Sequence, residues 1–206
     1  MTEMENKAEI AGTLARLLSR PESELLAALD SGAVAETLAP YLDKSERGRQ
    51  LFGAGHTIEG LSSLYEKTMG YTAEKRLHPV ESLFKAWCSN AMEEEQREEL
   101  RGLLMGDPAV HMLTLYSGCG IDIPEEYHSR PDHLVLQLEF LSLLYENSTD
   151  GIVLGFITDH LDWMPELRAR CGQLEVPDFY IGAVEAIDSF LNSEIERIRC
   201  LQEVRA

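Results

Sequence analysis

The sequence has few basic residues for its length. Its 206 residues include 18 lysines and arginines against 36 aspartates and glutamates, which gives a formal net charge of −18 at pH 7. Such an excess of acid argues against binding to the phosphate backbone of nucleic acids or to an anionic membrane surface. It favours partners that carry positive charge, although the solubility of the chain is a sufficient explanation by itself. We therefore expect no nucleic-acid partner.

Signals for export and for membrane insertion are also missing. The first ten residues, MTEMENKAEI, contain no basic segment followed by an apolar one, and no apolar run is long enough to span a bilayer. The four cysteines are widely scattered and none forms a C-x-x-C pair: Cys88, Cys119, Cys171 and Cys200. We interpret them as reduced, small hydrophobic residues rather than as zinc ligands or redox centres. These absences predict a cytoplasmic protein without membrane insertion.

The common catalytic motifs are absent as well. The sequence has no H-E-x-x-H, G-x-S-x-G, P-loop or G-x-G-x-x-G pattern. Asp132-His133 and Asp159-His160 repeat one dipeptide, and Cys119 and His128 lie near the first, but no set of nucleophile, base and orienting group stands out. A metal site built by tertiary contacts between scattered histidines is the less favoured alternative. We predict that the chain is not an enzyme and holds no metal or cofactor.

Helical periodicity dominates what is present. Ile10, Leu14, Leu17 and Leu18 share one face near the N-terminus. Near the C-terminus, apolar residues advance by threes and fours along one stripe: Tyr180, Ala183, Val184, Ile187, Phe190, Leu191, Ile195, Ile198 and Leu201. No segment alternates convincingly as a β-strand does. The pattern predicts an all-α fold, a single globular bundle of roughly eight to eleven helices.

The chain is expected to form one domain over residues 1–206, since 44% of its residues are apolar and can bury a core. Its longest non-periodic stretch runs from Gly118 to Pro131, and the loop 117–130 is the candidate place for a subdivision. A second loop spans residues 70–78. The charge run 92–102 is expected to be a solvated helix face.

The helix expected after Asp132 is apolar almost all round. One apolar face consists of Leu134, Leu138, Leu141 and Tyr145, and the opposite face consists of Leu136, Phe140, Leu143 and Leu144. A narrow, mostly polar strip contains Val135, Glu139, Ser142 and Glu146. A helix of this kind is packed on several sides, so it should be central. Its N-terminus is expected to lie at a crevice where other elements meet.

Two interpretations of Asp132 stay open. Ser129 and Asp132 fit the S-x-x-D capping pattern, so the carboxylate can serve the helix amides, with His133 a partly buried structural histidine. Alternatively, a carboxylate beside an imidazole at the mouth of an apolar crevice suits a ligand with a cationic head and an apolar body. Arginine pairs bidentately with a carboxylate and is the natural head. The two interpretations are compatible, because a carboxylate accepts several hydrogen bonds.

Four segments, in order, resemble the TorD-like redox-enzyme maturation chaperones, which serve trimethylamine-oxide, dimethyl-sulfoxide and nitrate reductases. The most informative is EEYHSRPDHLVLQLEFLSLL, where an acid–His–Leu after a proline-containing loop opens a helix. The others are KAEIAGTLARLLSRPESELLAAL, LYEKTMGYTAEKRLHPVESLF and FITDHLDWMPELRARC. The resemblance covers most of residues 7–195.

This resemblance implies an all-helical cytoplasmic chaperone, a monomer or a domain-swapped dimer, whose partner is the catalytic subunit of a molybdenum-cofactor enzyme. It would bind the twin-arginine signal peptide of that enzyme and delay export until the cofactor is inserted. The peptide-binding residues implied are Asp132, His133 and the adjacent Pro131, a second surface stretch with Pro79, Glu81 and Ser82, and Glu139 on the following helix.

Two departures from the family concern the apolar pocket. Val80 stands where relatives often have tryptophan, and Thr68-Met69 stands where Leu-Phe often follows the tyrosine helix. They leave open which client is served. The alternatives are a chaperone for a client without a twin-arginine leader, as in the nitrate-reductase branch, and an Asp/His-dependent hydrolase or nucleotide-using enzyme.

Overall fold

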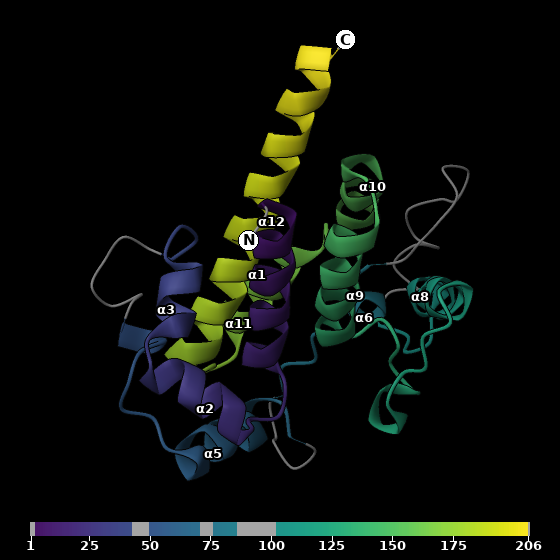
Figure 1. The fold of residues 1–206 in the computed structure, drawn as a ribbon. Coiled ribbons are helices and arrows are strands. Elements are labelled where there is room, and N and C mark those ends of the chain that lie inside the picture. The colour runs from purple at the N-terminus through teal and green to yellow at the C-terminus, as the bar shows by residue number, and fades with distance from the viewer. Residues whose placement is uncertain (1–2, 43–49, 71–75, 86–101, 206) are drawn as a thin grey trace.

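The structure is a computed structural model that describes residues 3–42, 50–70, 76–85 and 102–205. Within these ranges it contains ten α-helices and one 3-10 helix (Figure 1): α1 Glu3–Leu18, α2 Ser23–Asp30, α3 Ala33–Leu38, α5 Ile58–Thr68, α6 Glu81–Phe84, α8 Asp107–Gly118, η1 Glu125–Tyr127, α9 Leu134–Asn147, α10 Asp150–His160, α11 Met164–Gln173 and α12 Asp178–Arg205. No strand occurs in them, and the sole ladder contact is an isolated bridge between Val80 and His133. The predicted all-α fold is confirmed.

Helix α9 is the centre of the bundle. It packs most extensively against α1 and also against α10. Leu134, Leu138 and Leu141 are completely buried. The polar strip also contacts α1, since the Ser142 hydroxyl donates a 2.8 Å hydrogen bond to the carbonyl of Ala8. The prediction of a central helix is therefore confirmed.

Helix α12 packs against α1, α10 and α11 along its predicted apolar stripe. The stripe is largely buried from Tyr180 to Ile198. Leu201, the last residue of the stripe, is 37% exposed. The reason is visible in Figure 1, where the last turns of α12 extend beyond the other helices.

A buried carboxylate fixes α12 to its neighbours. Glu194 is fully buried and lies 2.6 Å from Lys7 Nζ on α1 and 3.0 Å from Arg197 Nη2. Tyr145 on α9 donates a 3.0 Å hydrogen bond to it. Because an unpaired buried charge is costly, these partners hold three helices in one register.

The prediction that all four cysteines are small hydrophobic residues is only partly confirmed. Cys171 is buried, whereas Cys119 and Cys200 are exposed and do not pack in the core; Cys88 lies outside the described residues. The charge run lies outside them up to residue 101, as do residues 71–75 of the second loop. In the described ranges, no helix has both the length and the apolar character needed to cross a bilayer.

Candidate functional site

The segment that ends in α6 runs alongside the start of α9. Val80 and His133 form an antiparallel bridge. The amide of Leu134 donates to the carbonyl of Pro79 at 2.8 Å, and the amide of Glu81 donates to the carbonyl of Asp132 at 3.1 Å. Two segments that are far apart in the sequence are thereby joined through their backbones.

The carboxylate of Asp132 faces this joined segment. It is completely buried, and its Oδ2 accepts a 2.7 Å hydrogen bond from the amide of Ser82 in the first turn of α6. The predicted S-x-x-D capping of α9 is wrong, because Asp132 satisfies an orphan amide of a different helix. Its other oxygen, Oδ1, is buried and has no hydrogen-bond partner among the described residues.

His133 is the residue that caps α9. Its Nδ1 accepts a 3.2 Å hydrogen bond from the amide of Val135, and its ring lies 5.1 Å from that of Tyr127. Since Nδ1 is the acceptor, the neutral ring carries its proton on Nε2. Burial, followed by the charges of Arg130 and His78, lowers the pKa of His133 to about 3. The imidazole is therefore neutral at physiological pH.

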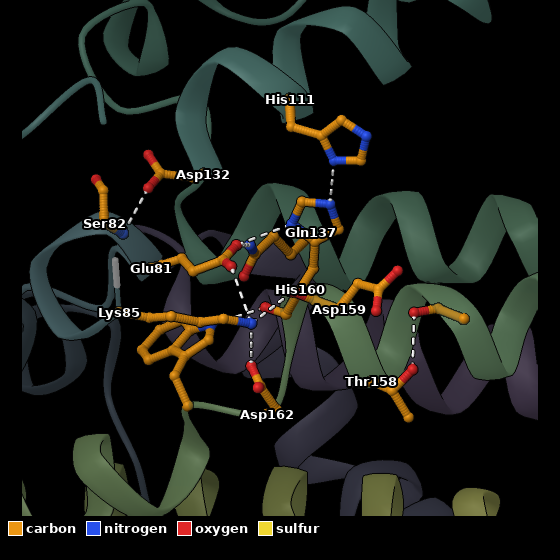
Figure 2. A network of polar contacts seen from close by, with 12 residues as sticks. Glu81, Ser82, Lys85, His111, Asp132, Gln137, Thr158, Asp159, His160 and Asp162 are labelled. Carbon is orange, nitrogen blue, oxygen red and sulfur yellow. Dashed lines mark hydrogen bonds and ion pairs between the residues drawn. The ribbon is translucent and has the colours of Figure 1, made fainter. Parts of the chain in front are cut away.

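Glu81 lies at the centre of a second, connected set of contacts (Figure 2). It is fully buried, and its Oε2 accepts hydrogen bonds from Gln137 at 2.6 Å and from His160 Nδ1 at 2.9 Å. Lys85 Nζ lies 3.8 Å from the other oxygen. These contacts tie α6 to α9 and to the end of α10.

The contacts continue from His160 to α8. His160 Nε2 lies 2.8 Å from His111 Nδ1, with the two rings stacked at 4.9 Å. Burial and the neighbouring His160 lower the pKa of His111. Lys85 extends the set in the other direction, donating to the carbonyl of Asp159 at 2.7 Å and to Asp162 at 2.6 Å, as Figure 2 shows.

We call the buried part of this arrangement the buried junction, defined as Glu81, Ser82, Asp132, His133, Gln137 and His160. It joins α6, α9 and α10 and, through His111, reaches α8. The side chains of Asp132 and His133 bond to different amides instead of to each other. In the part of the chain that the structure describes, no group of three or more histidine, cysteine or acidic side chains could hold a metal ion. The contacts brace the helices against one another, and Ser82 Oγ, Asp132 Oδ1 and Gln137 Oε1 are buried without a hydrogen-bond partner among the described residues.

The structure brings the predicted site residues together but mostly inside the protein. Six of the seven are buried, namely Pro79, Glu81, Ser82, Pro131, Asp132 and His133, and only Glu139 is exposed. The prediction that residues 79–82 form a surface stretch is wrong, because this segment is covered on one side by α9. A role of the seven residues in peptide binding stays a prediction.

Sequence reasoning missed Gln137 as a site residue and did not connect His160 with Glu81. Gln137 lies one turn after His133, on a face that counted as apolar. Asp159-His160 was noticed as a repeated dipeptide, but its partner lies 79 residues away in the sequence. Local patterns carry no signal for such a contact.

Comparisons with known proteins find similar sequences over most of the chain. The family model described as nitrate reductase delta subunit matches residues 22–174. Chaperone protein TorD from two strains of Vibrio cholerae serotype O1 is 27% identical over 213 residues, covering 97% of this chain and 94% of the relative. TorD from a third strain is 26% identical over the same coverage.

A solved structure also has a similar fold. The crystal structure of a putative redox enzyme maturation protein from Archaeoglobus fulgidus aligns with a TM-score of 0.53 and 20% identity. The alignment covers 97% of this chain and 95% of that one. At this identity, the similarity concerns the arrangement of the helices.

Proposed function

We infer that this chain, which belongs to the nitrate reductase delta subunit family, is a cytoplasmic maturation chaperone that binds the twin-arginine signal peptide of a molybdoenzyme. By holding the peptide, it would keep the catalytic subunit from export until the molybdenum cofactor is in place.

The coarse part of this function follows from the family and its named members. The chain is a TorD-like redox-enzyme maturation chaperone and not a catalyst. The observation that carries the proposal is the match to TorD over nearly the whole length of both chains.

The charge of the chain supports the choice of a cationic peptide. The net charge of −18 attracts a peptide with adjacent arginines and raises the rate of encounter. The apolar run of a signal peptide needs exposed apolar surface, and this chain carries such surface next to the buried junction.

Because most of the predicted site residues are buried, we expect their role in peptide binding to be indirect. An arginine could reach the carboxylate of Asp132 only if residues 79–85 moved away from α9, because Ser82 and α9 enclose it. We propose that Asp132, His133, Pro131, Pro79, Glu81 and Ser82 act as positioning residues for the surface around them. Glu139, which is exposed, is the member of the set that a peptide can touch without rearrangement.

A second candidate function is favoured by one observation. The matching family model is described as the nitrate reductase delta subunit, so a client without a twin-arginine leader fits the family equally well. In that case the chaperone would bind a segment of the client itself. The alternative of an Asp/His-dependent enzyme has no comparable support, since Asp132 and His133 are buried and their side chains bond to different amides instead of to each other.

Affinity capture of the full-length protein from its native cell tests the proposal. The expected partner is the catalytic subunit of a molybdoenzyme, and deleting its twin-arginine leader should abolish capture. Capture that survives the deletion would favour the second candidate. Recovery of no oxidoreductase subunit, with the protein folded and abundant, would contradict both.

A further inference from the structure

Large apolar side chains are exposed along α8 and the turn before it. Leu103, Leu104, Met105, Val110 and Leu113 are each 36% to 55% exposed. Five large apolar residues are thus exposed within eleven positions, and Val110 and Leu113, three residues apart, share one side of the helix. Exposed apolar residues gathered in this way are typical of interaction sites. Figure 1 shows α8 and the loop after it at the right-hand edge of the molecule, away from α2, α3 and α5.

The turn before α8 is fixed to the buried junction. The amide of Gly102 donates to the carbonyl of Ser82 at 3.3 Å, and a Cβ on Gly106 would lie 3.4 Å from Cβ of Ser82. Between these glycines, Met105 has a φ of 61°, a conformation that costs a non-glycine residue about 1–2 kcal/mol. The apolar side chains of the turn are thus displayed from a firmly attached backbone.

A hollow of about 590 Å³ continues the apolar surface at the other end of α8. Leu113 belongs to both, and Tyr116 lies buried at the base of the hollow. The remaining lining comes from the last turn of α8 and the loop after it: Ser117, Gly120, Ile121, Asp122, Ile123 and His128. The Tyr116 hydroxyl donates to the carbonyl of Pro131 at 3.1 Å, which fixes the base of the hollow to the start of α9.

The charge of this region is mainly negative, and the guanidinium of Arg130, at its border, lies 5.3 Å from the centre of the Tyr127 ring. Residues 102–129 contain four acidic residues, Asp107, Asp122, Glu125 and Glu126, and no lysine or arginine. All four are exposed. Asp122 lines the hollow, and the two glutamates lie in η1, between the lining residues Ile123 and His128. An occupant must therefore offer apolar side chains and positive charge together.

We propose that this region, which we call the α8 surface, is where the leader peptide of the client docks. It comprises the five exposed apolar residues, the hollow, and the acids Asp122, Glu125 and Glu126. The arginines of the leader pair with the acids around the hollow, and its apolar run lies along Val110, Leu113 and the turn 103–105. This inference rests on the proposed function, because it assigns a place to the same ligand.

The dimensions suit a short extended segment. Twelve residues of α8 span about 18 Å at 1.5 Å per residue, which matches about five or six residues of extended peptide. The ion pairs between the arginines of the peptide and the acids of the surface would be exposed, so each contributes little to the affinity. The apolar contacts supply the larger share.

Two pairs of matched variants test the surface. In the first, Val110→Gln with Leu113→Gln is compared with Leu143→Gln and Ile152→Gln on α9 and α10, which are 42% and 54% exposed. In the second, Asp122→Asn with Glu125→Gln and Glu126→Gln is compared with Glu36→Gln, Glu166→Gln and Glu175→Gln, all exposed acids elsewhere. Both members of the second pair change the net charge by the same three units.

The probe is a synthetic peptide with two adjacent arginines followed by an apolar run, titrated into each folded full-length protein. We expect the Val110/Leu113 variant to bind about tenfold more weakly and the Asp122/Glu125/Glu126 variant about threefold more weakly. Both controls should stay within about twofold of the unmodified protein. Unfolding curves of all five proteins establish that the variants are folded.

Two results would overturn the inference, and they are distinguishable. If the unmodified protein binds the peptide and the α8 variants bind equally well, the surface is wrong while leader binding stands. If the unmodified protein does not bind the peptide, leader binding and the α8 surface fail together.

Discussion

The buried junction and the α8 surface adjoin each other but have opposite physical character. The junction consists of carboxylates, an amide and imidazoles whose hydrogen bonds are made inside the protein. The α8 surface consists of apolar side chains and acids that face solvent. Contacts of α8 and the turn before it join the two regions. Gly102 bonds to the carbonyl of Ser82, His111 lies 2.8 Å from His160, and Tyr116 bonds to the carbonyl of Pro131, next to Asp132.

The difference concerns the residues that carry the family resemblance. The acid–His–Leu motif and the Pro-x-Glu-Ser stretch are the most recognisable residues, and in the structure they contact each other. We propose that they hold the backbone from which the neighbouring α8 surface is displayed. Substitutions in the two regions should therefore differ in what they change, stability in one and affinity in the other.

The largest effect is expected from Glu81→Ala. It removes the acceptor shared by Gln137 and His160 at a fully buried position, so the free energy of unfolding should fall by about 3–5 kcal/mol. Glu139→Ala is the matched control, an exposed glutamate that should change it by less than about 0.5 kcal/mol. Denaturant unfolding measures the stability of both variants. Equal losses of stability would contradict the assignment of Glu81 as a buried structural residue and Glu139 as an exposed one.

Acid should weaken the junction through His133. The unfolded chain binds a proton at this residue near pH 6.5, whereas the folded chain does so only near its pKa of about 3. Stability is thus fully present above pH 6.5 and is lost as pH falls toward 3, by about 2 kcal/mol at pH 5.

His133→Asn isolates this contribution, because asparagine can also cap a helix but does not titrate. Unfolding curves at pH 7.5 and pH 5 should show the variant losing less stability on acidification than the unmodified protein. The other histidines with lowered pKa, His78 and His111, are present in both and cancel in the comparison. An identical pH dependence for the two proteins would show that His133 is not held neutral.

Salt should act on the α8 surface and not on the junction. Exposed acids are screened beyond about 0.1 M salt, so the affinity for the arginine peptide should fall roughly fivefold between low and high ionic strength. A residual affinity from apolar contacts should persist. Titrations across a salt series measure this, and affinity that is constant throughout would mean that charge plays no part in recognition.

The smallest effect is expected on the stability of the protein when apolar residues of the α8 surface are replaced. Val110→Gln with Leu113→Gln alters exposed positions, so the free energy of unfolding should change by less than about 0.5 kcal/mol for each. A large loss would mean that these side chains pack against the protein and are not available to a ligand.

Helical periodicity was sufficient to predict the fold and the central position of α9. The spacing of Leu134, Leu138 and Leu141 describes a face of one element, and burial of several faces makes that element central. Both predictions depend on patterns that are present within single segments.

The burial of the site could not be predicted in this way. Whether residues 79–82 lie on the surface depends on how a short, non-periodic segment packs against α9, and no local spacing records that. The same holds for Glu81 and His160, which meet across 79 residues. Asp132 fitted a capping pattern but caps α6, because the amide that it reaches comes from a distant part of the chain.

Asp132→Asn, with stability and peptide affinity measured on the same samples, tests the central claim most directly. Asparagine keeps the shape but weakens the bond to the Ser82 amide, so we expect the free energy of unfolding to fall by about 1–2 kcal/mol. Affinity for the arginine peptide, and for a control peptide with lysines in place of the arginines, should stay within about twofold of the unmodified protein. The opposite result, a loss of about tenfold for the arginine peptide alone at unchanged stability, would place the arginine on Asp132 and contradict the account.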